Sequence, residues 1–393
     1  MIRPSRTLFK ALCLMLPASV LLTQTLQAGL DYQLRKPDLS EKRFQADSSR
    51  PVRAGFIRIS DQLDKNKPLG MADFSGMTEA SGLLIGSVDP KWVCGMEYPG
   101  MKPRWCTEAP ADLTIPPTVF GSWGVLGFRT GQLSKFNART GNIEWKVQLD
   151  KLPTRKVVKT GNKLIVVTAS QSVYALDYQS GKTLWVFDSE DPDGIAVNSV
   201  SPPVIHQKTV YVGMASGEVI AINLENGKKI WAHNPAYNNQ RFHDVIGDMQ
   251  VVDKVLVLSR FDGIVAGINI ENPSRPPAGW EEPKKFNTIT ANAFRHGRMY
   301  IGTNNGYVYA LNPRNGNKLW ETFAGTSVNS ITPGETRLYT AGASGRINAL
   351  NSQTGAVYWY DQIEGAVASK PVYVGKNIYF STGLKVLYGY QMR

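Results

Sequence analysis

The chain has 393 residues, including 36 glycines and 23 prolines, and carries a formal net charge of +12. Such abundant turn residues, with no helical periodicity after the first thirty residues, exclude a helical bundle and favour an all-β fold with many short strands. A positive charge of this size is usual for a solvated rim, and an acidic partner or anionic membrane headgroups would also fit it.

Residues 1–28 have the pattern of an export signal. Arg3, Arg6 and Lys10 precede a short apolar core at 11–22, and Ala28 offers a small residue for cleavage before Gly29. This core is too short for a stable membrane span. Cleavage would remove three positive side chains and lower the formal charge from +12 to +9. We therefore expect a periplasmic protein without a nucleic-acid partner, open to peripheral association with the outer membrane. A polar segment at 29–53 and a folded domain at 54–393 would follow the signal.

Only two cysteines remain after such a cleavage, Cys94 and Cys106. They lie twelve positions apart, on what should be neighbouring strands of one long hairpin, and exported proteins commonly oxidise such pairs. We predict a disulfide here, with two buried free thiols as the alternative. Cys13 follows a poor lipobox, so we expect no lipid attachment at that residue.

A unit of about 40 residues recurs along the chain and ends in Trp. In the five clear copies, Asn or Asp stands four residues before a Gly, and Trp stands four residues after that Gly. The short polar side chain can bond its own turn and Gly accepts a positive φ, which is the chemistry of a tight hairpin. A second turn fourteen residues before most of these Trp residues implies consecutive antiparallel strands. The five copies end at Trp145, Trp185, Trp231, Trp320 and Trp359.

Divergent units end at Trp105 and at Trp280, the latter with a Pro-rich stretch at 272–279, which gives seven units ending in Trp. A further unit begins at Asn377, but the chain stops before its outer strand. The apolar segment Ala54–Ser60 is the expected donor of that strand. We predict an eight-bladed β-propeller of four-stranded antiparallel blades, closed by pairing of the two chain ends, which removes exposed sheet edges. Seven blades is the alternative if the Trp105 unit is an insertion.

The sequence shows no pattern of catalytic residues. The histidines at 206, 233, 243 and 296 form no metal-binding spacing, and neither a nucleophile elbow nor a phosphate-binding Gly loop occurs. The acidic stretch from Asp188 to Asp193 faintly suggests a calcium loop, but Pro192 and the missing distal Glu break its ligand spacing. We therefore expect no enzyme activity, no metal site and no cofactor.

Units of the form VYVG, Gly, ALN or ALD, NG or SG, then LW resemble the repeat of pyrroloquinoline-quinone-type propellers over Gly82 to Arg393. Quinoprotein dehydrogenases of this superfamily hold their quinone over an adjacent Cys-Cys disulfide beside calcium ligands. This chain has no adjacent cysteines. Its Trp residues recur in every unit, so they are better explained as packing between blades than as a quinone platform. A dehydrogenase remains an alternative interpretation.

The chain also resembles the BamB family, the periplasmic propellers of the machine that inserts β-barrels into the outer membrane. The likeness lies in chain length, in the eight-blade count and in the stretch Arg241–Val255, which is similar to the family's Arg-x-x-Asp-Val loop. The resemblance implies a non-catalytic scaffold, monomeric within a larger complex, whose loops dock on a POTRA module of the barrel subunit BamA. A propeller of another envelope complex, or one that binds a glycan or other ligand in its central funnel, is a further alternative.

Carried over position by position, the resemblance implies contacts in two loops. Asp244 and Val245 would dock from one loop, and Ile195, Val197 and Asn198 from the preceding one. Asn198 stands where the family commonly has Arg, and Ile246 where it commonly has a second acidic residue, which weakens any docking based on charge. The alternative is that Ile195 and Val197 belong to a blade core.

Overall fold

The computed structural model describes residues 52–58, 76–89, 91–98, 102–188, 200–236, 242–367, 369–375, 377–384 and 386–391. The predicted signal peptide at 1–28 and the polar segment up to residue 51 lie outside the described residues. Every regular element within the described ranges is a β-strand, and the strands form eight four-stranded sheets.

Each of the first seven sheets is a meander of four consecutive antiparallel strands, which makes one blade. The strands of the first four blades are β2–β5 (Met77–Ala80, Leu83–Asp89, Trp92–Glu97, Lys102–Glu108), β6–β9 (Thr118–Phe120, Trp123–Gly127, Gln132–Asn137, Ile143–Gln148), β10–β13 (Val158–Thr160, Lys163–Val167, Val173–Asp177, Thr183–Phe187) and β14–β17 (Val204–His206, Thr209–Gly213, Val219–Asn223, Lys229–His233). The next three are β18–β21 (Val245–Val252, Val255–Arg260, Ile264–Asn269, Lys284–Lys285), β22–β25 (Ile289–Arg295, Arg298–Thr303, Tyr307–Leu311, Lys318–Phe323) and β26–β29 (Val328–Pro333, Arg337–Gly342, Arg346–Asn351, Val357–Gln362).

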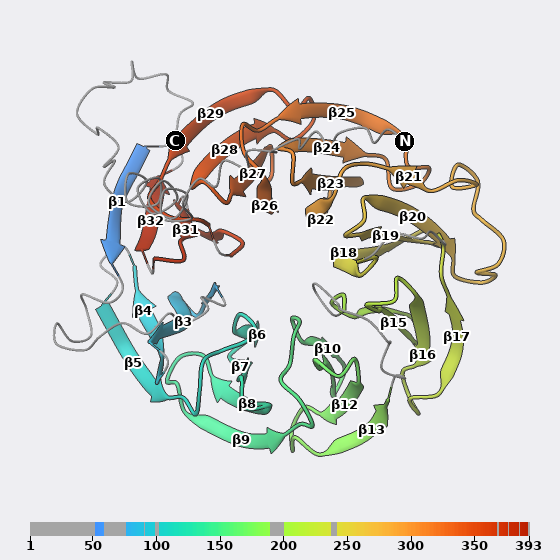
Figure 1. The fold of residues 1–393 in the computed structure, drawn as a ribbon. Helices are drawn as coiled ribbons and strands as arrows, with labels where there is room; N and C mark the ends of the chain where they lie inside the picture. The colour runs from blue at the N-terminus through green and yellow to red at the C-terminus, as the bar shows by residue number, and fades with distance from the viewer. Residues whose placement is uncertain are drawn as a thin grey trace, which may run out of the picture. The chain divides into compact units, whose positions relative to one another are not determined.

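The eighth blade joins the two ends of the folded unit. It contains β30 (Val372–Val374), β31 (Asn377–Ser381) and β32 (Val386–Gln391), and its outermost strand is β1 (Val52–Arg58). β1 runs antiparallel to β32, with Val52 opposite Gln391 and Arg58 opposite Val386. Figure 1 shows the blue β1 beside the red β32, where the ring of blades closes. The predicted eight-bladed propeller is therefore confirmed, although the closing strand begins two residues earlier than expected, at Val52.

The repeated Trp and Gly meet at the seams between blades. The indole N–H of Trp185 donates to the Leu224 carbonyl of the next blade over 3.0 Å, and Trp145 donates to Tyr178 over 3.1 Å. A Cβ placed on Gly227 would lie only 2.7 Å from the Trp185 ring. Gly227 thus supplies both the positive φ of its turn, +72°, and the space for the indole of the preceding blade. This double role explains why Gly and Trp recur together in the sequence.

The fifth blade departs from the repeat. Its outer strand β21 is only two residues long and begins after Trp280, whereas the Trp residues of the other repeats lie within their outer strands. Proline has no amide proton to donate to a ladder, and Pro273, Pro276 and Pro277 precede this Trp. The divergent unit at Trp280 therefore keeps its fourth strand, shortened to two residues, and the indole still packs on Gly267 of β20.

The two cysteines form the predicted disulfide. Cys94 of β4 stands directly opposite Cys106 of β5, and their sulfur atoms are 2.01 Å apart. Cys94 is fully buried. The bridge therefore joins the two outer strands of the first blade.

Candidate partner-docking site

The two predicted docking loops connect the third blade to the fourth and the fourth to the fifth. Ile195, Val197 and Asn198 lie outside the described residues. Asp244 and Val245 are described, and both side chains are fully buried. Asp244 and Val245 therefore lie in the packed interior rather than on the surface.

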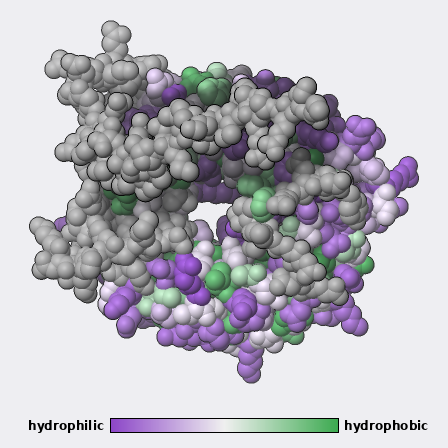
Figure 2. Space-filling view, viewed as in Figure 1, coloured by the Kyte–Doolittle hydropathy of each residue, from purple (hydrophilic) through white to green (hydrophobic). Residues whose placement is uncertain are grey.

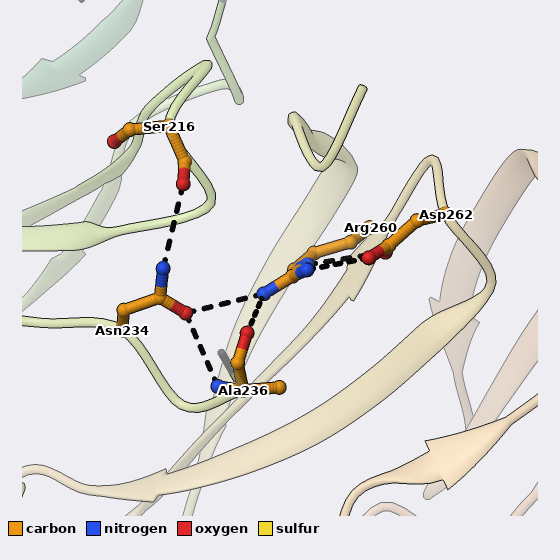
Figure 3. Close-up of polar contacts among 5 residues, drawn as sticks. All are labelled: Ser216, Asn234, Ala236, Arg260 and Asp262. Carbon is orange, nitrogen blue, oxygen red and sulfur yellow. Dashed lines mark hydrogen bonds and ion pairs between the residues drawn. The ribbon is translucent and has the colours of Figure 1, made fainter. Parts of the chain in front are cut away.

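A buried ion pair fixes the start of the loop between β17 and β18. Arg260, at the end of β19, is 1% exposed, and its Nη2 lies 2.5 Å from Asp262 Oδ2. The same guanidinium donates to Asn234 Oδ1 over 3.1 Å and to the Ala236 carbonyl oxygen. Asn234 also donates to the Ser216 carbonyl oxygen of the neighbouring turn, as Figure 3 shows. Because a buried guanidinium must satisfy its donors, these contacts fix the start of the loop at Asn234 and Ala236.

The end of the same loop is held by its backbone. The Val245 amide donates to the Met214 carbonyl oxygen over 3.1 Å, and the Asp244 carbonyl oxygen accepts from the Phe261 amide over 2.9 Å. Val245 packs in the core between the fourth and fifth blades, where a Cβ on Gly213 would clash with its side chain. The loop is therefore anchored in both adjoining blades.

A third interblade loop reaches the same region through Arg155. Its Nε donates to the Val200 carbonyl oxygen over 2.5 Å, which ties the loop before β10 to the loop before β14. Burial lowers the pKa of the Arg155 guanidinium, and the Asp244 and Asp248 carboxylates oppose that shift. Arg155 therefore joins the loops before β10 and β14, and its charge interacts with the carboxylates of Asp244 and Asp248 at the start of the fifth blade.

Asp248 lies on a bulge of the innermost strand β18. The ladder to β19 shifts register between Ile246 and Gln250, and Gly247 adopts a φ of +63°. Asn292 of β22 holds this bulge, because its side chain accepts from the Asp248 amide over 2.7 Å and donates to the Asp248 carbonyl oxygen over 2.8 Å. Lys370 Nζ, from the loop before β30, lies 2.9 Å from Asp248 Oδ2 although their blades are not neighbours. The bulge therefore links the innermost elements of the fifth, sixth and eighth blades.

Phe242, within the family-like stretch, is the residue of this site that the sequence did not reveal. The residue is 37% exposed and its φ is +63°. Asp244 and Val245, two and three positions further on, are buried. The chain therefore passes from the surface to the core within three positions. No sequence signal marks Phe242, because Phe is not a residue that ordinarily favours positive φ.

The centre of the ring and the metal-binding residue types bear on any catalytic role. Figure 2 shows an opening at the centre of the ring, and the coloured residues beside it are a mixture of polar and apolar ones. Within the described ranges no three His, Cys, Asp or Glu side chains are arranged to hold a metal ion. The part of the chain that the structure describes also contains no helix long and apolar enough to cross a membrane.

Strand order, repeat and closure define the class of protein: an eight-bladed β-propeller with pyrroloquinoline-quinone-like repeats. The family model for outer membrane protein assembly factor BamB matches residues 100–322 and 304–392, so the chain belongs to that family. The resemblance seen in the sequence is confirmed.

Two curated relatives carry the name outer membrane protein assembly factor BamB. The protein of Legionella pneumophila (strain Paris) is 25% identical over 199 residues, which cover 48% of this chain and 50% of the relative. The protein of Shewanella oneidensis is 21% identical over 262 residues, which cover 65% of each chain. The matches thus span half and about two thirds of these relatives.

Solved structures show the same fold. The crystal structure of BamB from Moraxella catarrhalis superimposes with a TM-score of 0.70 at 23% identity, over 87% of this chain and 100% of that one. A quinohemoprotein alcohol dehydrogenase from Pseudomonas putida gives a TM-score of 0.62 at 12% identity, over 82% of this chain and 75% of the enzyme. At these identities both similarities establish the fold alone.

Proposed function

We propose that this chain is a non-catalytic periplasmic scaffold of the outer-membrane β-barrel assembly machinery, and that its interblade loops bind a POTRA module of the BamA-type barrel subunit. Membership of the BamB family supports the role in barrel assembly. The hydrogen bonds of Arg155 and Arg260 to interblade loops support these loops as the docking site. Binding of this kind needs recognition alone. A rigid ring presents loops at fixed positions, and a partner packs against them.

The family match carries the proposed role, and the fully buried pair of Arg260 and Asp262 is the structural observation that supports the proposed docking loop. A buried ion pair is an expensive way to gain stability, because its desolvation offsets much of its attraction. Here the pair fixes Asn234 and Ala236, at the start of the loop between β17 and β18. A loop held in one conformation loses less entropy when a partner binds, which favours affinity.

The residues suggested by the family resemblance then have two different roles. Asp244 and Val245 are buried, so we assign them to shaping the loop rather than to touching the partner. Ile195, Val197 and Asn198 of the preceding loop remain proposed contacts. With Asn198 in place of the usual Arg, apolar contacts would contribute more of the affinity than charge.

Affinity purification of the tagged chain from cell envelopes, followed by mass spectrometry, tests the function. Recovery of a BamA-type subunit supports it, whereas recovery of a different envelope complex, or of no partner, contradicts it. Addition of pyrroloquinoline quinone and calcium should give neither binding nor dye reduction. Either response would favour the dehydrogenase.

A double variant tests whether the loop between β17 and β18 is part of the docking site. Asp244→Asn with Val245→Ala should weaken capture of the subunit while circular dichroism still reports a β-sheet protein. Arg139→Ala, in an exposed hairpin turn of the second blade, is the matched control and should leave capture unchanged. Equal capture by all three proteins would move the docking surface elsewhere.

A further inference from the structure

Phe242 stands apart from the other residues with positive φ. Six non-glycine residues of the described chain adopt this backbone conformation, and the other five are polar residues in hairpin turns within blades, namely Ser81, Gln171, Gln207, Asp253 and His296. Phe242 lies in a loop between blades. A bulky side chain in this region strains the backbone, and such strain persists only where the surroundings impose it.

The surroundings of Phe242 do impose it. A Cβ on Gly217 would lie 2.9 Å from the His243 carbonyl oxygen, so the backbone directly after Phe242 runs close against the turn of the fourth blade. Asp244 and Val245 are then drawn into the core. With the following residues fixed inward, the Phe242 side chain is directed to the surface.

Phe242 also stands apart from the other exposed apolar residues. Leu184, Ile230, Leu319 and Tyr358 are 42–51% exposed, and each directly precedes the repeated Trp of its outer strand. Their exposure follows from the repeat. Within the described parts of the loops that connect successive blades, Phe242 is the one large apolar residue that is exposed.

We propose that Phe242 is the apolar anchor by which the propeller binds its partner. The proposal rests on the proposed function and assigns the occupant: the same POTRA module, with an apolar pocket that takes the phenyl ring. Aromatic side chains that enter such a pocket dominate the affinity of protein interfaces, while the surrounding contacts exclude water. Arg260 is the proposed positioning residue, because it holds the start of the loop, at Asn234 and Ala236, whose end carries Phe242.

Titration of the full-length exported chain with the purified POTRA segment of the BamA-type subunit tests the anchor. Phe242→Ala and Phe242→Gly should each weaken the Kd by about tenfold or more, the loss typical of a central aromatic anchor. Leu319→Ala removes an apolar side chain of the repeat that is even more exposed, at 47%, and should change the Kd by less than about twofold, as a near-neutral contact does. Phe242→Gly should also melt at the same or a higher temperature, because glycine adopts positive φ without strain.

The outcomes separate the two proposals. If the unsubstituted chain binds the POTRA segment and both Phe242 variants bind equally well, the anchor is wrong and the proposed function stands. Absence of binding by the unsubstituted chain contradicts both. A lower melting temperature for Phe242→Gly would contradict the inferred backbone strain.

Discussion

The seams between blades and the loop between β17 and β18 are built by different means. A seam uses a residue pair that recurs around the ring, an indole of one blade on a glycine of the next, as Trp185 does on Gly227. The loop uses residues that occur once, chiefly Arg260, Asp262 and Phe242. The repeated contacts stabilise the propeller. The residues that occur once make one interblade loop different from the others, and we propose that the partner binds there.

Removal of a seam Trp should have the largest effect on stability. Trp185→Ala loses a side chain that is 8% exposed together with its hydrogen bond to Leu224, and should lower the free energy of unfolding by about 3–5 kcal/mol. Urea unfolding followed by tryptophan fluorescence measures the loss. Binding of the POTRA segment should be unchanged while the variant is folded. A loss below about 1 kcal/mol would contradict the role of Trp in the seams.

Breaking the buried pair should affect both stability and binding. Arg260→Met leaves Asp262 buried without its cation and should cost about 3–5 kcal/mol. The double variant Arg260→Met with Asp262→Leu should recover part of that stability, because no buried charge remains, yet it should still bind the partner weakly. Urea unfolding and titration of the three proteins test this. Full recovery of binding in the double variant would show that the loop keeps its path without the pair.

Loss of the disulfide should lower the free energy of unfolding without changing partner affinity. Replacement of Cys94 and Cys106 by Ala should cost about 3 kcal/mol, as expected for a bridge that closes a short loop. The bridge lies in the first blade, away from the loop between the fourth and fifth. Partner affinity should therefore stay the same, and a parallel loss of affinity would place part of the docking surface on the first blade.

Acidification should have the smallest effect on the stability of the folded chain. Burial lowers the pKa of His233, which precedes the clamped Asn234, below its ordinary value of 6.5. The folded chain then binds this proton less readily than the unfolded one, so stability is retained above about pH 6.5 and falls as the pH drops through that value. Thermal unfolding between pH 7.5 and 5.5 measures the change. His233→Asn should flatten part of this dependence, and an unaltered profile would contradict the contribution of His233.

Much of the fold could be predicted because the repeat carries it in local chemistry. The spacing of Asn, Gly and Trp fixed the hairpins, and the missing outer strand after Asn377 pointed to closure by the N-terminal segment, now seen as β1 on β32. The Pro-rich stretch before Trp280 was visible in the sequence, but the length of strand that it would leave was not predicted, and β21 has only two residues.

The site was harder to predict because its determinants are distant in sequence. Arg260 meets Asn234 and Ala236 only after the fourth and fifth blades have packed. Burial of Asp244 and Val245 likewise depends on a neighbouring blade, which the Arg-x-x-Asp-Val pattern does not report. The positive φ of Phe242 is imposed by that packing, so the residue looks ordinary in the sequence.

Hydrogen–deuterium exchange of the exported chain, with and without the POTRA segment, tests the central claim most directly. The account predicts that binding slows exchange in peptides covering residues 234–244 and leaves the outer strands β25 and β29 unchanged. Protection confined to those outer strands, with the loop between β17 and β18 unaffected, would contradict it.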